Sequence, residues 1–384
     1  MNPSRRTRIL IVDDSAVMRS LLRPLVTADP ALEVSGTAAD GASALSAVET
    51  LRPDLVLLDV EMPVMDGLST VRELRRRGHK MPVIMVSALT GHGGRITLEA
   101  LASGASDYVT KPTGQASREE ASRALAQDLI PKIHALTRPS ILHSHSSQIY
   151  PQASALPPAL RMPLTMPSPP TGTPPPNSPL TVLAIGVSTG GPAALELVLP
   201  ALPADFPLPI LIVQHMPELF TKLFAERLNG RCPLRVCEAS DGEPVRSGSI
   251  YIARGNWHLE ILAAARAAAD PTMHLTQGPL ENHCRPAVDV LFRSAAAVYR
   301  SGVLAVVLTG MGSDGLAGSR TVRAQGGAVL AQDQASSTVW GMPGAVTTAG
   351  LAHKVLPLGA IASEILRLAA RNRSEVPQPL KLVV

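Results

Sequence analysis

A dense block of prolines divides this chain of 384 residues and limits what it can fold into. Twelve of its 35 prolines lie between Pro139 and Pro179. Because proline lacks a backbone donor and fixes φ, neither a helix nor a sheet is expected there. The sequence therefore predicts an extended linker over 138–179 between two folded parts, 7–137 and 180–370, with a tail at 371–384. Within the linker, His143 and His145 lack a third ligand, which disfavours a metal site.

The composition favours a globular protein and excludes several other classes. Hydrophobic residues make up 45% of the chain, which is enough to build sizeable cores. No apolar run approaches the roughly 18 to 20 residues that a membrane span needs. The apolar stretch that follows Arg8 is too short for a signal peptide. We therefore expect a cytoplasmic protein that does not insert into a membrane.

The net charge of +4 does not indicate a nucleic-acid partner. Basic residues are spread along the chain, and aromatic residues are only 3% of it. A nucleic-acid surface needs clustered positive charge, ideally with aromatic side chains on which bases can stack. We expect no nucleic-acid binding.

Both halves alternate short apolar runs with helical patterns, which predicts an α/β protein with mainly parallel sheets. In the first half, strands are expected at 8–12, 55–58, 82–86 and 107–109, and helices at 15–27, 67–77 and 96–103. In the second half, strands are expected at 182–187, 210–214, 303–308 and 328–331, with helices after the first, third and fourth. The segment 244–252 is expected to be irregular or antiparallel.

Polar side chains follow the predicted strands of the first half. They are Asp13, Asp14, Asp59, Ser87 and Lys111. In parallel sheets, ligands bind beyond the carboxyl ends of the strands, so these groups are expected to converge. A divalent cation such as Mg²⁺ relieves the repulsion between carboxylates, while a lysine and a hydroxyl suit a phosphoryl group. A carboxylate can also accept that phosphoryl group covalently.

These residues resemble the receiver domain of two-component response regulators over about 7–137. The matching elements are Asp13-Asp14-Ser15, Leu57 to Gly67, Ser87-Ala88 and Lys111-Pro112. The resemblance implies a flavodoxin-like (βα)5 fold in which Asp59 is phosphorylated by a chemotaxis histidine kinase. It also implies that Asp14, beside Asp13, holds Mg²⁺ with Asp59 and the backbone carbonyl of Glu61. Ser87 and Lys111 would contact the phosphoryl group, and Tyr108 stands at the position of the family's switch aromatic.

The first candidate catalytic residue of the second half is a serine. Ser188 lies on a strand-to-helix turn, Gly186-Val-Ser-Thr-Gly-Gly-Pro192, where backbone N–H groups favour a developing oxyanion. Such a turn alone is weak evidence for catalysis. A phosphate-binding loop is disfavoured because the turn has no lysine.

Residues that follow two further strands strengthen the case for catalysis by Ser188. His215 follows the strand at 210–214, and Asp314 lies just beyond the strand at 303–308. A histidine can accept the serine proton and a carboxylate can orient the imidazole, as in serine hydrolases. The chain order Ser, His, Asp differs from that of α/β-hydrolases, which disfavours that fold.

The same glycine-rich segment allows a different function, dinucleotide binding. Gly310, Gly312 and Gly315 fit the spacing G-x-G-x-x-G, and Asp333 follows about eighteen residues later. Asp314 would then place a carboxylate beside a pyrophosphate, which is unfavourable. This alternative is therefore disfavoured.

Five segments of the second half resemble chemotaxis protein-glutamate methylesterases over about 180–370. They are Gly186 to Pro192, Val213 to Pro217, His283 to Phe292, Leu308 to Gly315 and Trp340 to Pro343. The resemblance implies hydrolysis of glutamate γ-methyl esters on methyl-accepting chemotaxis receptors, with release of methanol, and deamidation of selected receptor glutamines. It assigns the triad to Ser188, His215 and Asp314, with no cofactor for this reaction, and places Thr189, Gly190 and Met311 near the oxyanion.

The two halves together suggest regulation. We expect the unphosphorylated receiver to cover the triad and phosphorylation of Asp59 to uncover it. In one alternative, the receiver only concentrates the enzyme near its substrate. In another, the protein serves a non-chemotactic receptor, or acts as a phosphoryl sink or docking partner. Cys284 could be a reactive thiol, although a small packing residue is the favoured interpretation.

Overall fold

A computed structural model describes residues 5–112, 117–137, 179–264, 266 and 270–370. The tail and all of the predicted linker except Pro179, including His143 and His145, lie outside the described residues.

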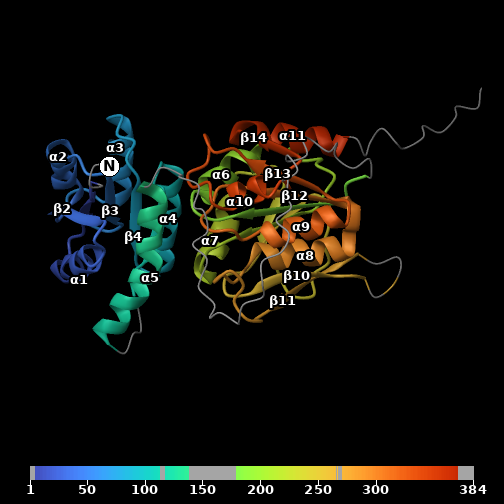
Figure 1. The fold of residues 1–384 in the computed structure, drawn as a ribbon, viewed down its shortest axis with the longest axis horizontal. Coiled ribbons are helices and arrows are strands. Elements are labelled where there is room, and N and C mark those ends of the chain that lie inside the picture. The colour runs from blue at the N-terminus through green and yellow to red at the C-terminus, as the bar shows by residue number, and fades with distance from the viewer. Residues whose placement is uncertain (1–4, 113–116, 138–178, 265, 267–269, 371–384) are drawn as a thin grey trace, which may run out of the picture.

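The first half contains a parallel five-stranded sheet with helices on both faces (Figure 1). The strand order is β2-β1-β3-β4-β5. The strands are β1 (Thr7–Val12), β2 (Leu32–Ala38), β3 (Leu55–Asp59), β4 (Val83–Ser87) and β5 (Asp107–Thr110). The helices are α1 (Ala16–Thr27), α2 (Gly41–Leu51), α3 (Gly67–Arg76), α4 (Gly91–Ala102) and α5 (Arg118–Thr137).

The three central strands of this sheet, β1, β3 and β4, each carry a run of four apolar residues because both faces of the sheet are covered. On β1, Ile9 and Ile11 pack into one hydrophobic cluster, and Leu10 and Val12 pack into another. Alternate residues of a strand point to opposite faces, so a two-sided core needs an unbroken apolar run. This confirms the α/β class and the parallel sheet predicted for this half.

The second half contains a parallel seven-stranded sheet in the order β14-β13-β12-β6-β7-β9-β8. Its strands are β6 (Val182–Val187), β7 (Ile210–Gln214), β8 (Arg235–Glu238), β9 (Ser249–Ile252), β12 (Val303–Val307), β13 (Ala328–Gln332) and β14 (Lys354–Leu356). The helices are α6 (Gly191–Val198), α7 (Glu218–Asn229), α8 (Val288–Tyr299), α9 (Leu316–Ala324), α10 (Met342–Thr348) and α11 (Leu358–Ala370), with short 3₁₀ turns η1 (Leu199–Ala201) and η2 (Arg300–Gly302). A separate antiparallel hairpin joins β10 (His258–Leu262) and β11 (Thr272–Thr276). The doubly wound, mainly parallel fold predicted for this half is confirmed.

Two expectations for this half are wrong. Of the segment 244–252, expected to be irregular or antiparallel, residues 249–252 form β9, a buried parallel strand between β7 and β8, whereas Pro244 does form an antiparallel bridge with Thr272. A helix, α7, also follows the strand at 210–214, where none was expected. Its buried face includes Phe220 and Phe224, and that apolar face outweighs the polar residues between them.

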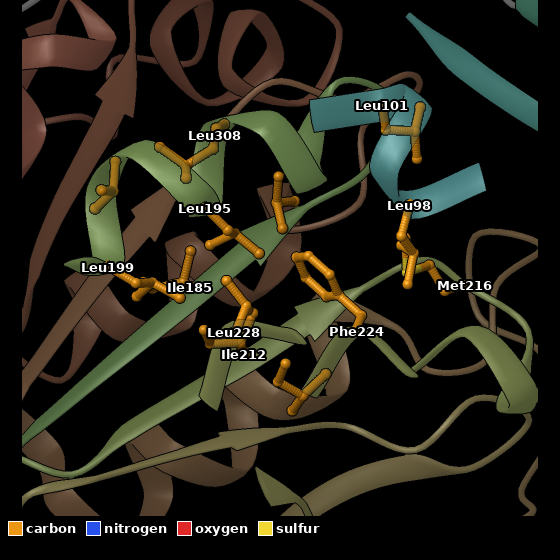
Figure 2. Packing of buried hydrophobic residues seen from close by; sticks show 14 of the residues in the cluster. Leu98, Leu101, Ile185, Leu195, Leu199, Ile212, Met216, Phe224, Leu228 and Leu308 are labelled. Carbon is orange, nitrogen blue, oxygen red and sulfur yellow. The ribbon is translucent and has the colours of Figure 1, made fainter. Parts of the chain in front are cut away.

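The two halves share one hydrophobic cluster. Leu98 and Leu101 of α4 belong to the same buried cluster as Met216 and Phe224, and Figure 2 shows Leu98 beside Met216. The ring of Tyr108 on β5 stacks on Phe220 of α7, with centroids 4.5 Å apart. Burying one such side chain contributes roughly 1.5–3 kcal/mol. The α4–β5 side of the first half is therefore packed against the second half.

Candidate active site and receiver site

Strand order brings the serine, histidine and aspartate together. In the sheet, β6 lies between β12 and β7. Ser188 directly follows β6, His215 directly follows β7, and Asp314 lies in the loop after β12. Because all three strands are parallel, the three residues lie at the same edge of the sheet.

The turn that carries Ser188 depends on glycine. Gly190 has φ +78° and caps the N-terminus of α6. A Cβ atom there would lie 2.4 Å from Thr338 Oγ1. A Cβ atom on Gly310 would lie 2.8 Å from Ser188 Cβ. The glycines therefore let the loop after β12 approach the serine closely.

Asp314 is a buried carboxylate with many donors. Its Oδ2 atom lies 2.9 Å from His215 Nε2 and accepts a hydrogen bond of 2.6 Å from the N–H of Val288. Its Oδ1 atom accepts from the N–H groups of Asp289 and Gly315, each at 3.0 Å. Burial alone would raise the pKa of Asp314, but the hydrogen bonds from His215, Val288 and Asp289 lower it below its usual value. Asp314 is thus held as an anion at the N-terminus of α8.

Two residues beside Asp314 were not singled out from the sequence. The amide of Asn282 donates to both Asp314 Oδ1 and Asp289 Oδ2, each at 2.9 Å. Asp289 is 3% exposed, and its Oδ1 accepts from the N–H of Gly318 at 2.6 Å. The sequence feature that could have pointed to Asp289 is its position as the single carboxylate in the apolar stretch Ala287-Val-Asp-Val-Leu-Phe292.

The second ring nitrogen of His215 faces a cysteine. Cys284 Sγ lies 3.6 Å from His215 Nδ1. Burial disfavours the charged imidazolium, but hydrogen bonds with Asp314 and Cys284 outweigh it and raise the pKa of His215 to about 9. Within the described part of the chain, Ser188 Oγ has no hydrogen-bond partner. In this state the histidine is engaged by Asp314 and Cys284, and not by the serine.

A cavity of about 710 Å³ connects the site to the first half of the chain. Ser188, His215, Cys284 and Met311 line it. The first half contributes lining residues from β5 and α5, which are Asp107, Tyr108, Thr110, Gln127, Asp128, Pro131 and Lys132. Residues of both halves therefore line this cavity.

One hydrogen bond crosses directly to the serine turn. Thr189 Oγ1 donates to Asp107 Oδ2 at 2.6 Å, and the carbonyl of Thr189 accepts from Thr309 Oγ1 at 2.9 Å. Burial raises the pKa of Asp107, and the charge of Lys132 opposes that shift only in part. Sequence reasoning did not select Asp107, although an acidic residue that opens a buried strand is an unusual feature.

The polar residues after the strands of the first half also meet. Lys111 Nζ lies 2.8 Å from Asp59 Oδ2 and 3.1 Å from Asp13 Oδ2. Burial raises the pKa of Asp59, and the negative charge of Asp13 adds to this, while Lys111 opposes it. Ser87 is fully buried and accepts a hydrogen bond of 2.7 Å from Thr97 Oγ1.

This acidic group fits a divalent cation. Asp13, Asp14 and Asp59 each offer a carboxylate oxygen within 4.8 Å of the others. Asp13 Oδ2 is buried and has no hydrogen bond among the described residues, although Lys111 Nζ lies 3.1 Å away. Carboxylate oxygens are the ligands that Mg²⁺ prefers. Glu61 is exposed on the loop after β3, and the role of its carbonyl stays a prediction.

No helix among the described residues is both long enough and apolar enough to cross a bilayer.

Comparison with known proteins identifies both halves. Residues 183–365 match the family model described as CheB methylesterase, and residues 9–122 match that of the response regulator receiver domain. A protein-glutamate methylesterase/protein-glutamine glutaminase from a Nocardioides species is 50% identical over 95% of this chain and 96% of its own length. A protein of the same name from Trichodesmium erythraeum is 45% identical over 94% of this chain and 98% of its own length.

Among solved structures, the CheB methylesterase catalytic domain of Thermotoga maritima is 42% identical. It covers 50% of this chain and 100% of its own, with a TM-score of 0.48. The two full-length relatives and the two family models together establish the relationship. The chain belongs to the CheB methylesterase family and carries a response regulator receiver domain ahead of its catalytic domain.

Proposed function

We propose that this protein hydrolyses glutamate γ-methyl esters on methyl-accepting chemoreceptors and deamidates selected receptor glutamines, acting in the cytoplasm under the control of its receiver domain. The observation that carries the proposal is His215, which lines one cavity with Ser188 and pairs with the buried Asp314. The names of the relatives supply the substrate class.

In the proposed reaction, Ser188 Oγ attacks the ester carbonyl and His215 accepts its proton. Asp314 stabilises the imidazolium, which its hydrogen bond to Nε2 supports. Backbone N–H groups of the Thr189–Gly190 turn and of the loop at Met311 stabilise the oxyanion. His215 then protonates the leaving methanol, and water releases the glutamate. With glutamine, the leaving group is ammonia.

Activation requires His215 to change partners. Its Nδ1 atom lies 3.6 Å from Cys284 Sγ, and Ser188 Oγ is unpaired among the described residues. A general base must reach the proton that it removes. We infer that the structure represents a resting state, from which His215 or Ser188 moves before the reaction.

The receiver half provides the control. Asp59 accepts a phosphoryl group from a chemotaxis histidine kinase, and Lys111 and Ser87 contact that group. Asp14, Asp59 and the carbonyl of Glu61 would hold Mg²⁺, with Asp13 alongside, and the cation would supply the positive charge that phosphoryl transfer requires. The cluster of carboxylates around the buried Asp13 Oδ2 supports this assignment.

Phosphorylation then weakens the contact between the halves. Tyr108 stacks on Phe220, and Asp107 holds Thr189 beside the serine. The receiver thus restrains the turn and covers the cavity against a bulky receptor helix. Phosphorylation shifts the population toward a state without these contacts.

The test is methanol release from chemoreceptor membranes that carry labelled methyl esters. The full chain is assayed with and without acetyl phosphate and Mg²⁺, with Ser188→Ala as the blank. We expect release that requires Ser188 and increases with the phosphodonor. No release by folded protein in either condition would overturn the proposal. Equal release in both conditions would overturn the regulatory part alone.

A further inference from the structure

The three cysteines of the chain lie in different surroundings. Cys232, Cys237 and Cys284 are all free and partly buried. Burial raises the pKa of Cys232 to about 11 and also raises that of Cys237. A thiol with a raised pKa stays protonated at neutral pH and is a poor nucleophile. Two of the three cysteines are therefore expected to be inert.

Cys284 differs from the other two cysteines because a histidine lies beside its sulfur and because the residue lines a cavity. Its Sγ atom lies 3.6 Å from His215 Nδ1, and both residues line the cavity of about 710 Å³. A thiol beside an imidazole is the usual arrangement of a reactive cysteine.

The loop that carries Cys284 is fixed in place. Cys284 and Glu281 exchange two backbone hydrogen bonds, of 2.9 and 3.1 Å. The side chain of Arg285 donates to the carbonyls of Gln277 and Gly278, at 3.0 and 2.8 Å. These bonds hold the backbone on both sides of the sulfur. The contact between Cys284 and His215 therefore belongs to a braced loop.

We propose that Cys284 is a modification site in the esterase cavity, where exchange with a low-molecular-weight disulfide turns the esterase off. This inference rests on the proposed esterase function of the same cavity. It gives the protein a thiol-based control that is separate from phosphorylation of Asp59.

The exchange balances without a further reactant. When His215 is neutral, the proton of Cys284 passes from Sγ to His215 Nδ1, and the thiolate attacks one sulfur of the disulfide R–S–S–R. That S–S bond breaks while the bond between Sγ and S–R forms. The leaving thiolate takes the proton from His215 and departs as R–SH. The cysteine sulfur is oxidised and the leaving sulfur is reduced, and an added thiol reverses the reaction.

The adduct would block the reaction in two ways. The group R would occupy the cavity that Ser188 and His215 line, where the ester must enter. The modified sulfur would also stand against His215 Nδ1, the nitrogen that Ser188 needs. Esterase activity is therefore expected to fall in proportion to the modified fraction.

The test treats the full-length protein with oxidised glutathione and follows each cysteine by peptide mass mapping. We expect Cys284 to be modified at least about tenfold faster than Cys232 and Cys237, and His215→Gln to remove most of this advantage. Methanol release should fall in step with the adduct and return with dithiothreitol. Release by Cys284→Ala should be insensitive to oxidised glutathione, whereas Cys232→Ala and Cys237→Ala should remain sensitive.

Two results would overturn the proposal. One is equal modification rates at the three cysteines, and the other is complete modification of Cys284 with unchanged methanol release. If the untreated protein releases no methanol, the proposed esterase function fails. The mapped rates are still measured in that case, and equal rates overturn the reactive-site assignment without any activity assay.

Discussion

The two halves of the molecule each bury a carboxylate beside a cationic side chain, yet the pKa values of the two carboxylates shift in opposite directions. Burial raises the pKa of Asp59 despite the ion pair with Lys111. The pKa of Asp314 is lowered despite burial. The number of donors explains the difference, because Asp314 accepts from three backbone N–H groups as well as from His215 and Asn282.

This contrast matches two kinds of chemistry. In the proposed esterase reaction, Asp314 must remain an anion while the proton moves between serine and histidine, and its many hydrogen bonds favour that form. In the proposed phosphoryl transfer, Asp59 must present an oxygen to phosphorus with a cation nearby, which suits its few hydrogen-bond donors and the neighbouring carboxylates. A carboxylate that accepts many hydrogen bonds orients its neighbour, whereas one that accepts few is available to react.

The sharpest test of the contrast removes the charge of Asp314. We expect Asp314→Asn to lower kcat for methanol release by about 10³-fold or more, because the amide cannot stabilise the imidazolium. Asp289→Asn is the matched control, since it alters a second buried carboxylate on the same Asn282 amide. Asp289→Asn should lower kcat by only about tenfold, as expected for a residue that supports a catalytic one. Equal losses in the two variants would contradict a special role for Asp314.

The pH profile tests the other partner of Asp314. His215 must be neutral to accept a proton, and its pKa is raised to about 9. For a single ionisation, kcat/KM should rise about tenfold per pH unit below that value and level off above it. In Cys284→Ala the rising limb should move to lower pH, because the contact with Cys284 is one cause of the raised pKa. A profile already flat at pH 7 would show that His215 is not held in this way during turnover.

Replacement of Asp59 tests the reactive carboxylate. We expect Asp59→Asn to abolish the increase in methanol release on addition of acetyl phosphate and to leave release without phosphodonor nearly unchanged. Chelation of Mg²⁺ in the unmodified protein should have the same effect, because both changes prevent phosphoryl transfer. An undiminished phosphodonor response in Asp59→Asn would assign the phosphoryl acceptor to another residue.

The smallest expected effect concerns the contact between the two halves. Asp107→Ala removes the hydrogen bond to Thr189, so methanol release without phosphodonor should rise by a few-fold, which corresponds to about 1 kcal/mol or less, the lower end of typical coupling energies. Arg95→Ala is the control, since it removes an exposed ion pair with Glu226 at 3.7 Å across the same interface. Such pairs contribute little, and no change is expected. A rise in both variants would indicate general loosening of the interface.

The sequence by itself determined the two α/β halves and the identity of the groups at their sheet edges. Apolar runs such as Ile9–Val12 and Val303–Leu308 need two-sided burial, and polar residues directly after them must lie at the carboxyl edge. Motif resemblance then supplied the family, which the comparisons confirmed.

Tertiary structure alone decided which groups from distant segments share a hydrogen bond. Nothing in the local sequence pairs Asp107 with Thr189, 82 residues away, or aims Cys284 at His215, 69 residues away. It also made 249–252 a parallel strand, because β7 and β8 satisfy its backbone on both sides. The spacing of apolar residues along a segment indicates which of its faces are buried. Side-chain partners and pKa shifts depend on which surfaces are packed together, and this is settled only when the segments of each half fold and the two halves pack against each other.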